Sequence, residues 1–89
     1  MKITVQEKKI IREYFLEKEY GFNFEDNVCY LDSHNRHLLL YKGDRYGYLS
    51  PDVWVIEYES GFVDKFDLLD LAIKAGRDYF DFYWDKKVE

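Results

Sequence analysis

Residues 36–42 read Arg-His-Leu-Leu-Leu-Tyr-Lys, and the four apolar residues in the middle, 38–41, would face both sides of a β-strand. A strand that is apolar on both faces is typical of the centre of a sheet. Three further segments with strand-like composition surround it, at 27–32, 45–49 and 53–59, and the last is the richest in β-branched and aromatic residues. We therefore predict an antiparallel β-meander of three to four strands.

Short turn-forming segments separate these strands. They contain Ser, Asn, Gly or Pro, and they lie at 33–35, 43–44, 50–52 and 60–61. Gly43 would stand at the first central position of a two-residue loop. This position predicts a type II′ hairpin turn that joins the central strand to the next one.

An amphipathic helix is predicted before the strands, over residues 5–20. Thr4 and Glu7 have the capping-box spacing, in which each side chain accepts a hydrogen bond from the other residue's backbone N–H. Apolar residues then follow at helical spacing, namely Ile10, Ile11, Tyr14 and Phe15. Gly21 is expected to end the helix in the left-handed conformation.

A second helix is predicted after the strands, with Asp64 as its N-cap. Gly76 leaves two possibilities open. Either the helix ends there and 79–84 form an edge strand, or it continues to about Lys86 at a cost of roughly 1 kcal/mol for an interior glycine. Continuation is favoured, because it places five aspartates on one stripe of the helix. The predicted fold class is α+β, with an N-terminal helix, the β-meander and a C-terminal helix.

The composition indicates one globular domain over residues 1–89, because 47% of the chain is hydrophobic and 20% is aromatic. No apolar run approaches the roughly 18 residues that span a bilayer, and the first residues lack the apolar stretch of a signal peptide. A single Cys excludes an internal disulfide and fits a reducing compartment. We therefore expect a cytoplasmic protein that does not bind membranes.

The net charge of −5 belongs to the second half of the chain. Residues 1–45 carry eight basic and eight acidic side chains, whereas residues 46–89 carry five basic and ten acidic ones. Proteins bind nucleic acids mainly through Lys and Arg, which neutralise phosphates. This charge balance therefore argues against direct nucleic-acid binding.

One cluster of possible metal ligands is present in the sequence, formed by Cys29, Asp32, His34 and His37. Zinc accepts such side chains, but their spacing matches no standard zinc pair. A Cys–His nucleophile would need a lowered thiol pKa and an orienting third group, and the sequence indicates neither. We expect solvated turn histidines and a small buried Cys, and we predict no metal, no cofactor and no enzymatic activity.

The aspartates of the predicted second helix form a nearly one-signed stripe, with Lys74 among them: Asp67, Asp70, Asp78, Asp81 and Asp85. Such a stripe is most often the ordinary solvated face of an amphipathic helix. It would also span roughly 27 Å, comparable with eight phosphate steps of about 3.4 Å, and so could occupy the basic groove of a nucleic-acid-binding protein. The nine Tyr and two Trp favour an interface, since these residues anchor protein contacts.

From these features we predict a small acidic protein-binding module that inhibits or regulates a partner by docking on its basic, nucleic-acid-binding surface. In size and charge the chain is similar to small acidic proteins of phages and mobile elements, including DNA mimics and anti-CRISPR inhibitors. The residues expected to bind the partner are the five aspartates with Glu57, Glu59, Tyr79, Tyr83 and Trp84.

Alternatives to this function remain open. The chain could form a homodimer, of structural or regulatory role, that pairs through an aromatic sheet face. More remotely, it could be a metal-dependent enzyme that uses Cys29, His34 and His37. For Glu57 and Glu59, acid–base catalysis is possible in principle, but alternate residues on a strand share one face, so a solvated strand face is the simpler account.

Overall fold

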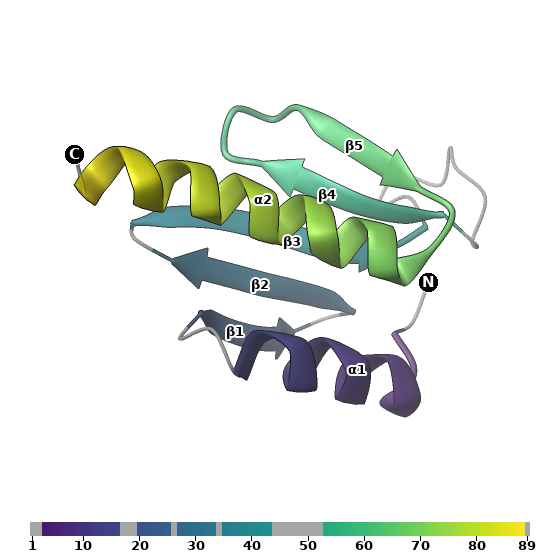
Figure 1. The fold of residues 1–89 in the computed structure, drawn as a ribbon. Helices are drawn as coiled ribbons and strands as arrows, with labels where there is room; N and C mark the ends of the chain where they lie inside the picture. Colours follow the sequence, from purple (N-terminus) through teal and green to yellow (C-terminus); the bar gives the residue numbers. More distant parts are fainter. Residues whose placement is uncertain (1–2, 17–19, 26, 34, 44–52, 89) are drawn as a thin grey trace.

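The computed structural model describes residues 3–16, 20–25, 27–33, 35–43 and 53–88, with only the backbone described at Leu16 and at 83–88. Within these residues the elements follow the order α1 (Val5–Leu16), β1 (Gly21–Glu25), β2 (Val28–Ser33), β3 (Arg36–Lys42), β4 (Trp54–Tyr58), β5 (Val63–Phe66) and α2 (Leu69–Val88). Both helices pack on one face of the sheet, where α2 crosses β3, β4 and β5 and α1 lies beside β1 (Figure 1). The architecture is therefore two layers, α+β.

The described strands form an antiparallel sheet in the order β1-β2-β3-β4-β5, so each strand pairs with its neighbour in the sequence. The prediction that 36–42 form the central strand is confirmed. The sheet has five strands where three to four were predicted, because both edge strands were missed. In place of these strands the sequence predicted a helix terminus at Gly21, now in β1, and a helix N-cap at Asp64, now in β5.

The N-terminal capping box is confirmed. The Thr4 N–H donates to Oε1 of Glu7 at 2.9 Å, and the Glu7 N–H donates to Oγ1 of Thr4 at 3.1 Å. Ile11 and Phe15 are buried in the core, whereas the other two apolar residues of the predicted face are more than a third exposed. The described part of α1 ends at Leu16, short of the predicted residue 20.

The prediction for Gly21 is wrong. Gly21 is not a left-handed helix terminus but the first residue of β1, where it pairs with Asp32. A Cβ at this position would overlap the carboxylate of Asp32, an exposed side chain that would have to move aside. Its substitution by Val would therefore strain a side-chain contact and not the backbone conformation.

The connections around β3 differ in length. Ser33 pairs with Arg36, and Asn35 has a φ of 65°, which confirms the tight turn at 33–35. On the other side Lys42 pairs with Trp54, so the predicted two-residue hairpin after Gly43 is wrong, although Gly43 does have a positive φ of 75°. His34, the strand predicted at 45–49 and the turn predicted at 50–52 lie outside the described residues.

The second helix continues through Gly76, as favoured from the sequence, and reaches Val88. It begins at Leu69, so the prediction of Asp64 as its N-cap is wrong, because Asp64 lies in β5. Gly76 is buried against the sheet, and a Cβ there would lie 3.6 Å from Cδ1 of Leu38 and 3.8 Å from Cδ1 of Ile56. These are ordinary contact distances.

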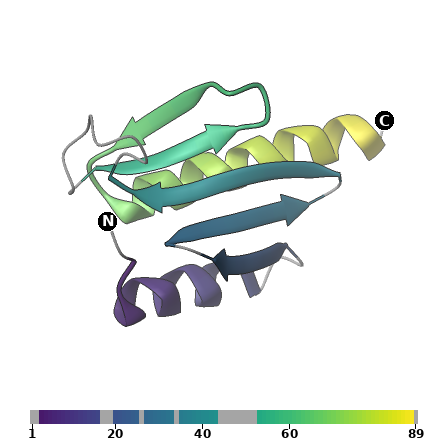
Figure 2. The same cartoon turned by 180° about the vertical axis from the view of Figure 1, so that it is seen from behind.

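The main core lies between the sheet and the helices. Its buried members are Ile3, Ile11, Phe15, Cys29, Leu31, Leu38, Leu40, Trp54, Ile56, Ala72, Ile73 and Phe80. The opposite face of the sheet, seen from behind in Figure 2, carries a smaller buried cluster of Val28, Tyr41 and Val55. None of the helices in the described part of the chain has the length and apolar character needed to cross a membrane.

Candidate functional site

The predicted stripe of five aspartates does not form one continuous surface on α2. Asp67 precedes the helix, and Asp70 and Asp78 are exposed on it. Asp78 accepts a hydrogen bond from Nζ of Lys74 at 3.0 Å, in an exposed i,i+4 ion pair. The side chain of Asp85, like those of Tyr83 and Trp84, lies outside the described residues.

Asp81 has a role within the fold. Its Oδ1 accepts a hydrogen bond of 2.7 Å from the hydroxyl of Tyr20, which is separated from it by most of the chain. The Tyr20 ring lies between Phe15 and Phe80, at centroid distances of 5.6 and 5.2 Å. Burial and the neighbouring Asp81 carboxylate raise the pKa of Tyr20 to about 12, so the phenol stays a donor. Asp81 therefore connects α2 to Tyr20, the residue directly before β1.

Apolar side chains stand beside the exposed aspartates of α2. Leu71 is 48% exposed and Phe82 is 52% exposed. At about 100° per residue, Leu71, Asp78 and Phe82 fall within roughly 40° of one another on the helix surface. Leu68, which precedes the helix, is 61% exposed. We call Leu68, Asp70, Leu71, Asp78 and Phe82 the outer face of α2.

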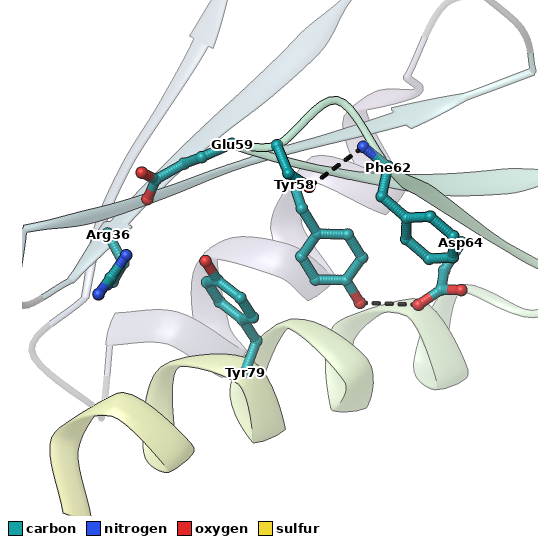
Figure 3. A pocket seen from close by; sticks show the side chains of 7 residues that line it. Arg36, Tyr58, Glu59, Phe62, Asp64 and Tyr79 are labelled. Atoms are coloured by element: carbon teal, nitrogen blue, oxygen red, sulfur yellow. Dashed lines mark hydrogen bonds between the residues drawn. The ribbon is translucent and has the colours of Figure 1, made fainter. Parts of the chain in front are cut away.

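A pocket lies beside this surface, between the β4–β5 hairpin and α2 (Figure 3). Its volume is about 520 Å³, and it is lined by Arg36, Tyr58, Glu59, Ser60, Phe62, Asp64 and Tyr79. We call it the hairpin pocket. Tyr79 is three residues before Phe82 on the helix, so the pocket adjoins the outer face of α2.

The hairpin is shaped by a three-residue loop. The N–H of Gly61 donates to the carbonyl of Tyr58 at 2.9 Å, and the N–H of Tyr58 donates to the carbonyl of Phe62 at 2.9 Å. Gly61 has a φ of 91°, a left-handed value that glycine adopts at little cost. This loop carries Phe62 to the rim of the pocket, where its side chain is 63% exposed.

The inner wall of the hairpin pocket is aromatic. The Tyr58 ring lies 5.0 Å from the Tyr79 ring and 6.0 Å from the Phe62 ring, measured between centroids. The Tyr58 hydroxyl donates a hydrogen bond of 2.8 Å to Oδ2 of Asp64. Burial raises the pKa of Tyr58, and the neighbouring Asp64 raises it further, so the phenol remains a hydrogen-bond donor.

Charged groups are distributed unevenly along the pocket. Figure 3 shows Asp64 with Phe62 at one end, and Glu59 and Arg36 at the other end. The carboxylate of Glu59 also accepts the backbone N–H of His37 at 2.6 Å. The lining therefore holds two carboxylates and one guanidinium, and the end at Asp64 is the more negative.

The predicted pair of Glu57 and Glu59 is divided between two environments. Glu57 accepts a hydrogen bond of 2.9 Å from the Tyr41 hydroxyl, on the sheet face that the helices leave open. Glu59 follows the end of β4 and lines the hairpin pocket. The structure thus does not bring these two carboxylates into a common site.

The candidate metal ligands are also separated. Cys29 is fully buried on the helix side of the sheet, whereas Asp32 and His37 pair with each other and face the other side. Burial raises the pKa of the Cys29 thiol to about 12, which disfavours the thiolate that metals and nucleophilic catalysis require. Among the described residues, no three His, Cys, Asp or Glu side chains come close enough to hold a metal ion.

Of the residues predicted to bind a partner, Glu59 and Tyr79 meet in the hairpin pocket. The other lining residues were not predicted as binding residues, and they are Arg36, Tyr58, Ser60, Phe62 and Asp64. A signal for them was present, because Ser60-Gly61 between two short apolar segments is typical of a hairpin. That hairpin was not predicted, because β5 was interpreted as the start of the helix.

Comparison of the chain with models of known protein families, with characterised proteins and with solved structures finds no match.

Proposed function

We propose that this protein is an acidic protein-binding module that docks on a basic surface of a partner protein. The observation that supports this function is the combination of exposed apolar and acidic side chains on the outer face of α2. Among the described residues of the second half, four large apolar side chains are between 48% and 63% exposed: Phe62, Leu68, Leu71 and Phe82. Exposed apolar groups of this size, rimmed by charged groups, are typical of protein-binding surfaces.

The charges specify the kind of partner. The aspartates at 67, 70 and 78 are exposed around these apolar residues, and the chain carries a net charge of −5. A basic partner surface would be attracted over a distance of about 10 Å at ordinary ionic strength. The apolar residues would then provide the short-range contacts, because complementary charge mainly raises the association rate.

The sharper form of this proposal is an inhibitor or regulator, of the kind that phages and mobile elements encode, that covers the nucleic-acid-binding surface of its partner. In this form the protein has no enzymatic activity and does not bind nucleic acid itself. The contact does not depend on five regularly spaced carboxylates, since Asp81 bonds to Tyr20 and Asp67 lies outside the helix. It depends on the apolar residues with Asp70 and Asp78 beside them.

The test uses the full chain as bait in extracts of the source organism, and each captured protein is then identified, purified and measured in pairwise binding. Asp70→Lys combined with Asp78→Lys is expected to slow association about tenfold at low salt. Leu71→Ser combined with Phe82→Ser is expected to speed dissociation, because these substitutions remove the apolar contacts. The partner's nucleic acid should compete with the wild-type protein.

A matched control is provided by Glu13→Lys combined with Glu25→Lys, which changes the net charge equally at exposed positions of α1 and β1. This control should leave association nearly unchanged. Equal slowing by the two pairs would contradict a specific outer-face contact. A protein that forms a homodimer, captures no basic partner and is dissociated by Tyr30→Lys on the open sheet face would favour the homodimer instead.

A further inference from the structure

The hairpin pocket has the composition of a site for an organic cation. Three aromatic rings line it, and the faces of such rings carry negative electrostatic potential that attracts cations within about 6 Å. Its two carboxylates exceed its one guanidinium, so the lining is negative overall. An anion would be repelled by Asp64, and a wholly apolar ligand would leave the Asp64 carboxylate without solvent.

The acidic end of the pocket is already organised. The Tyr58 hydroxyl donates to Oδ2 of Asp64, which holds the carboxylate beside the Tyr58 ring. Among the described residues the other oxygen of Asp64, Oδ1, receives no hydrogen bond. A cation that enters between Phe62 and Tyr79 would therefore find one fixed acceptor with an aromatic wall next to it.

This arrangement favours an ammonium group over a guanidinium. A guanidinium binds a carboxylate best through two parallel hydrogen bonds, which requires both carboxylate oxygens. In Asp64 the Tyr58 hydroxyl already bonds to Oδ2, so a guanidinium would have to share that oxygen through its second lone pair. An ammonium group needs only one oxygen at a time, and the alkyl chain of a lysine can pack against aromatic rings while its charged end reaches the acceptor.

We propose that the hairpin pocket receives a single lysine side chain of the partner protein, with the ammonium group at Asp64 and the alkyl chain against Tyr58, Phe62 and Tyr79. That a protein supplies the lysine rests on the proposed function. The pocket adjoins the outer face of α2, so a basic surface docked on that face would bring lysines to its rim. The pocket would then select among basic surfaces.

The test is an NMR titration of the full chain with Nα-acetyl-lysine methylamide. Ring signals of Tyr58, Phe62 and Tyr79 are expected to shift and to saturate with a dissociation constant of about 1–10 mM, as a single small contact would give. Nα-acetyl-norleucine methylamide, which has the alkyl chain without the charge, should produce no saturable shift. The arginine analogue should bind at least about threefold more weakly.

The control variants separate the pocket from general charge effects. Asp64→Asn keeps an acceptor for the Tyr58 hydroxyl and is expected to weaken the lysine probe about tenfold. Asp67→Asn removes the same charge at an exposed position outside the pocket and should have no effect. Unchanged core signals, such as those of Phe80, verify that both variants are folded.

The assignment would be overturned by no shift with the lysine probe, by equal shifts with norleucine, or by equal weakening by the two variants. Binding of the arginine analogue as tight as that of lysine would overturn it as well. Because the probe needs no partner, its failure leaves the outer-face proposal standing. Conversely, the pocket could bind the lysine probe while the protein captures no basic partner. That result would contradict the proposed function and leave the lysine preference of the pocket standing.

Discussion

The two faces of α2 are built from similar residues but have different surroundings. Ala72, Ile73, Gly76 and Phe80 face the sheet and are buried. Phe82, only two positions after Phe80, is 52% exposed. Side chains two positions apart on a helix point about 160° away from each other. The two phenylalanine side chains therefore lie in opposite environments.

This difference shows which apolar residues the fold needs. The inner face closes the core over β3, β4 and β5, and its apolar side chains are buried there. The outer face leaves apolar area in water, where it contributes little to folding. Apolar groups that do not stabilise the fold and yet remain exposed are the ones available for a partner.

The largest expected effect separates the two phenylalanines. Phe80→Ala should lower the free energy of unfolding by about 3–5 kcal/mol, since it opens a cavity in a close-packed core. Phe82→Ala should change the free energy by less than about 1 kcal/mol. Urea unfolding of both variants measures the difference. Similar losses in the two variants would mean that the outer face is covered in the free protein.

A second test concerns Cys29, which is buried in the main core between the sheet and the helices. Its pKa is raised to about 12 from an ordinary value of 9.0, so the folded state holds the proton more strongly than the unfolded chain. Stability from this group is therefore complete below about pH 9 and is lost as the pH rises toward 12. Melting temperatures between pH 7 and 11 should fall less steeply for Cys29→Ala than for the wild type. Burial also raises the pKa of Tyr20 and Tyr58, but these tyrosines are present in both the wild type and Cys29→Ala and so affect the two melting curves equally. If the melting temperatures of the two proteins fell equally with pH, the Cys29 thiol would be solvated.

The smallest effect is expected at Gly76 and has the opposite sign. Gly76→Ala should raise the free energy of unfolding by about 1 kcal/mol, because alanine is the better helix former and its Cβ would meet Leu38 at 3.6 Å, an ordinary contact. Urea unfolding checks this value, with Ala75→Gly as the reciprocal control that should destabilise. A loss of stability in Gly76→Ala would indicate that α2 lies closer to the sheet than the structure places it.

Three features of the fold could be predicted from local residue patterns. Apolar residues on both faces of 36–42 predict a central strand, and Thr4 with Glu7 predicts a helix start. Continuation through Gly76 was favoured because charged residues stayed on one side of the helix. The first two signals are local and have one interpretation, whereas the segment after Gly76 was compatible with both a helix and an edge strand.

The wrong predictions at Gly21 and Asp64 have a common cause, because both residues lie in short edge strands. Phe22 and Phe24 alternate as a strand requires, but Gly21 before them is also typical of a helix end. β5 has four residues and places Asp64 toward α2, where a strand in a simple core would have an apolar residue. The pocket was therefore not predicted. Its lining residues come from β3, the β4–β5 hairpin and α2, and they come together only when the strands pair and the helix packs on the sheet.

The order of the strands has a consequence for how the chain folds. β1, β2 and β3 are joined by short turns, and so are β4 and β5, so each of these groups can form by local pairing. Pairing of β3 with β4 closes the longest loop of the sheet, from Lys42 to Trp54. The entropic cost of closure grows with loop length, and contacts between distant residues form more slowly. The docking of the two groups, and not the formation of either one, therefore carries the largest closure cost within the sheet.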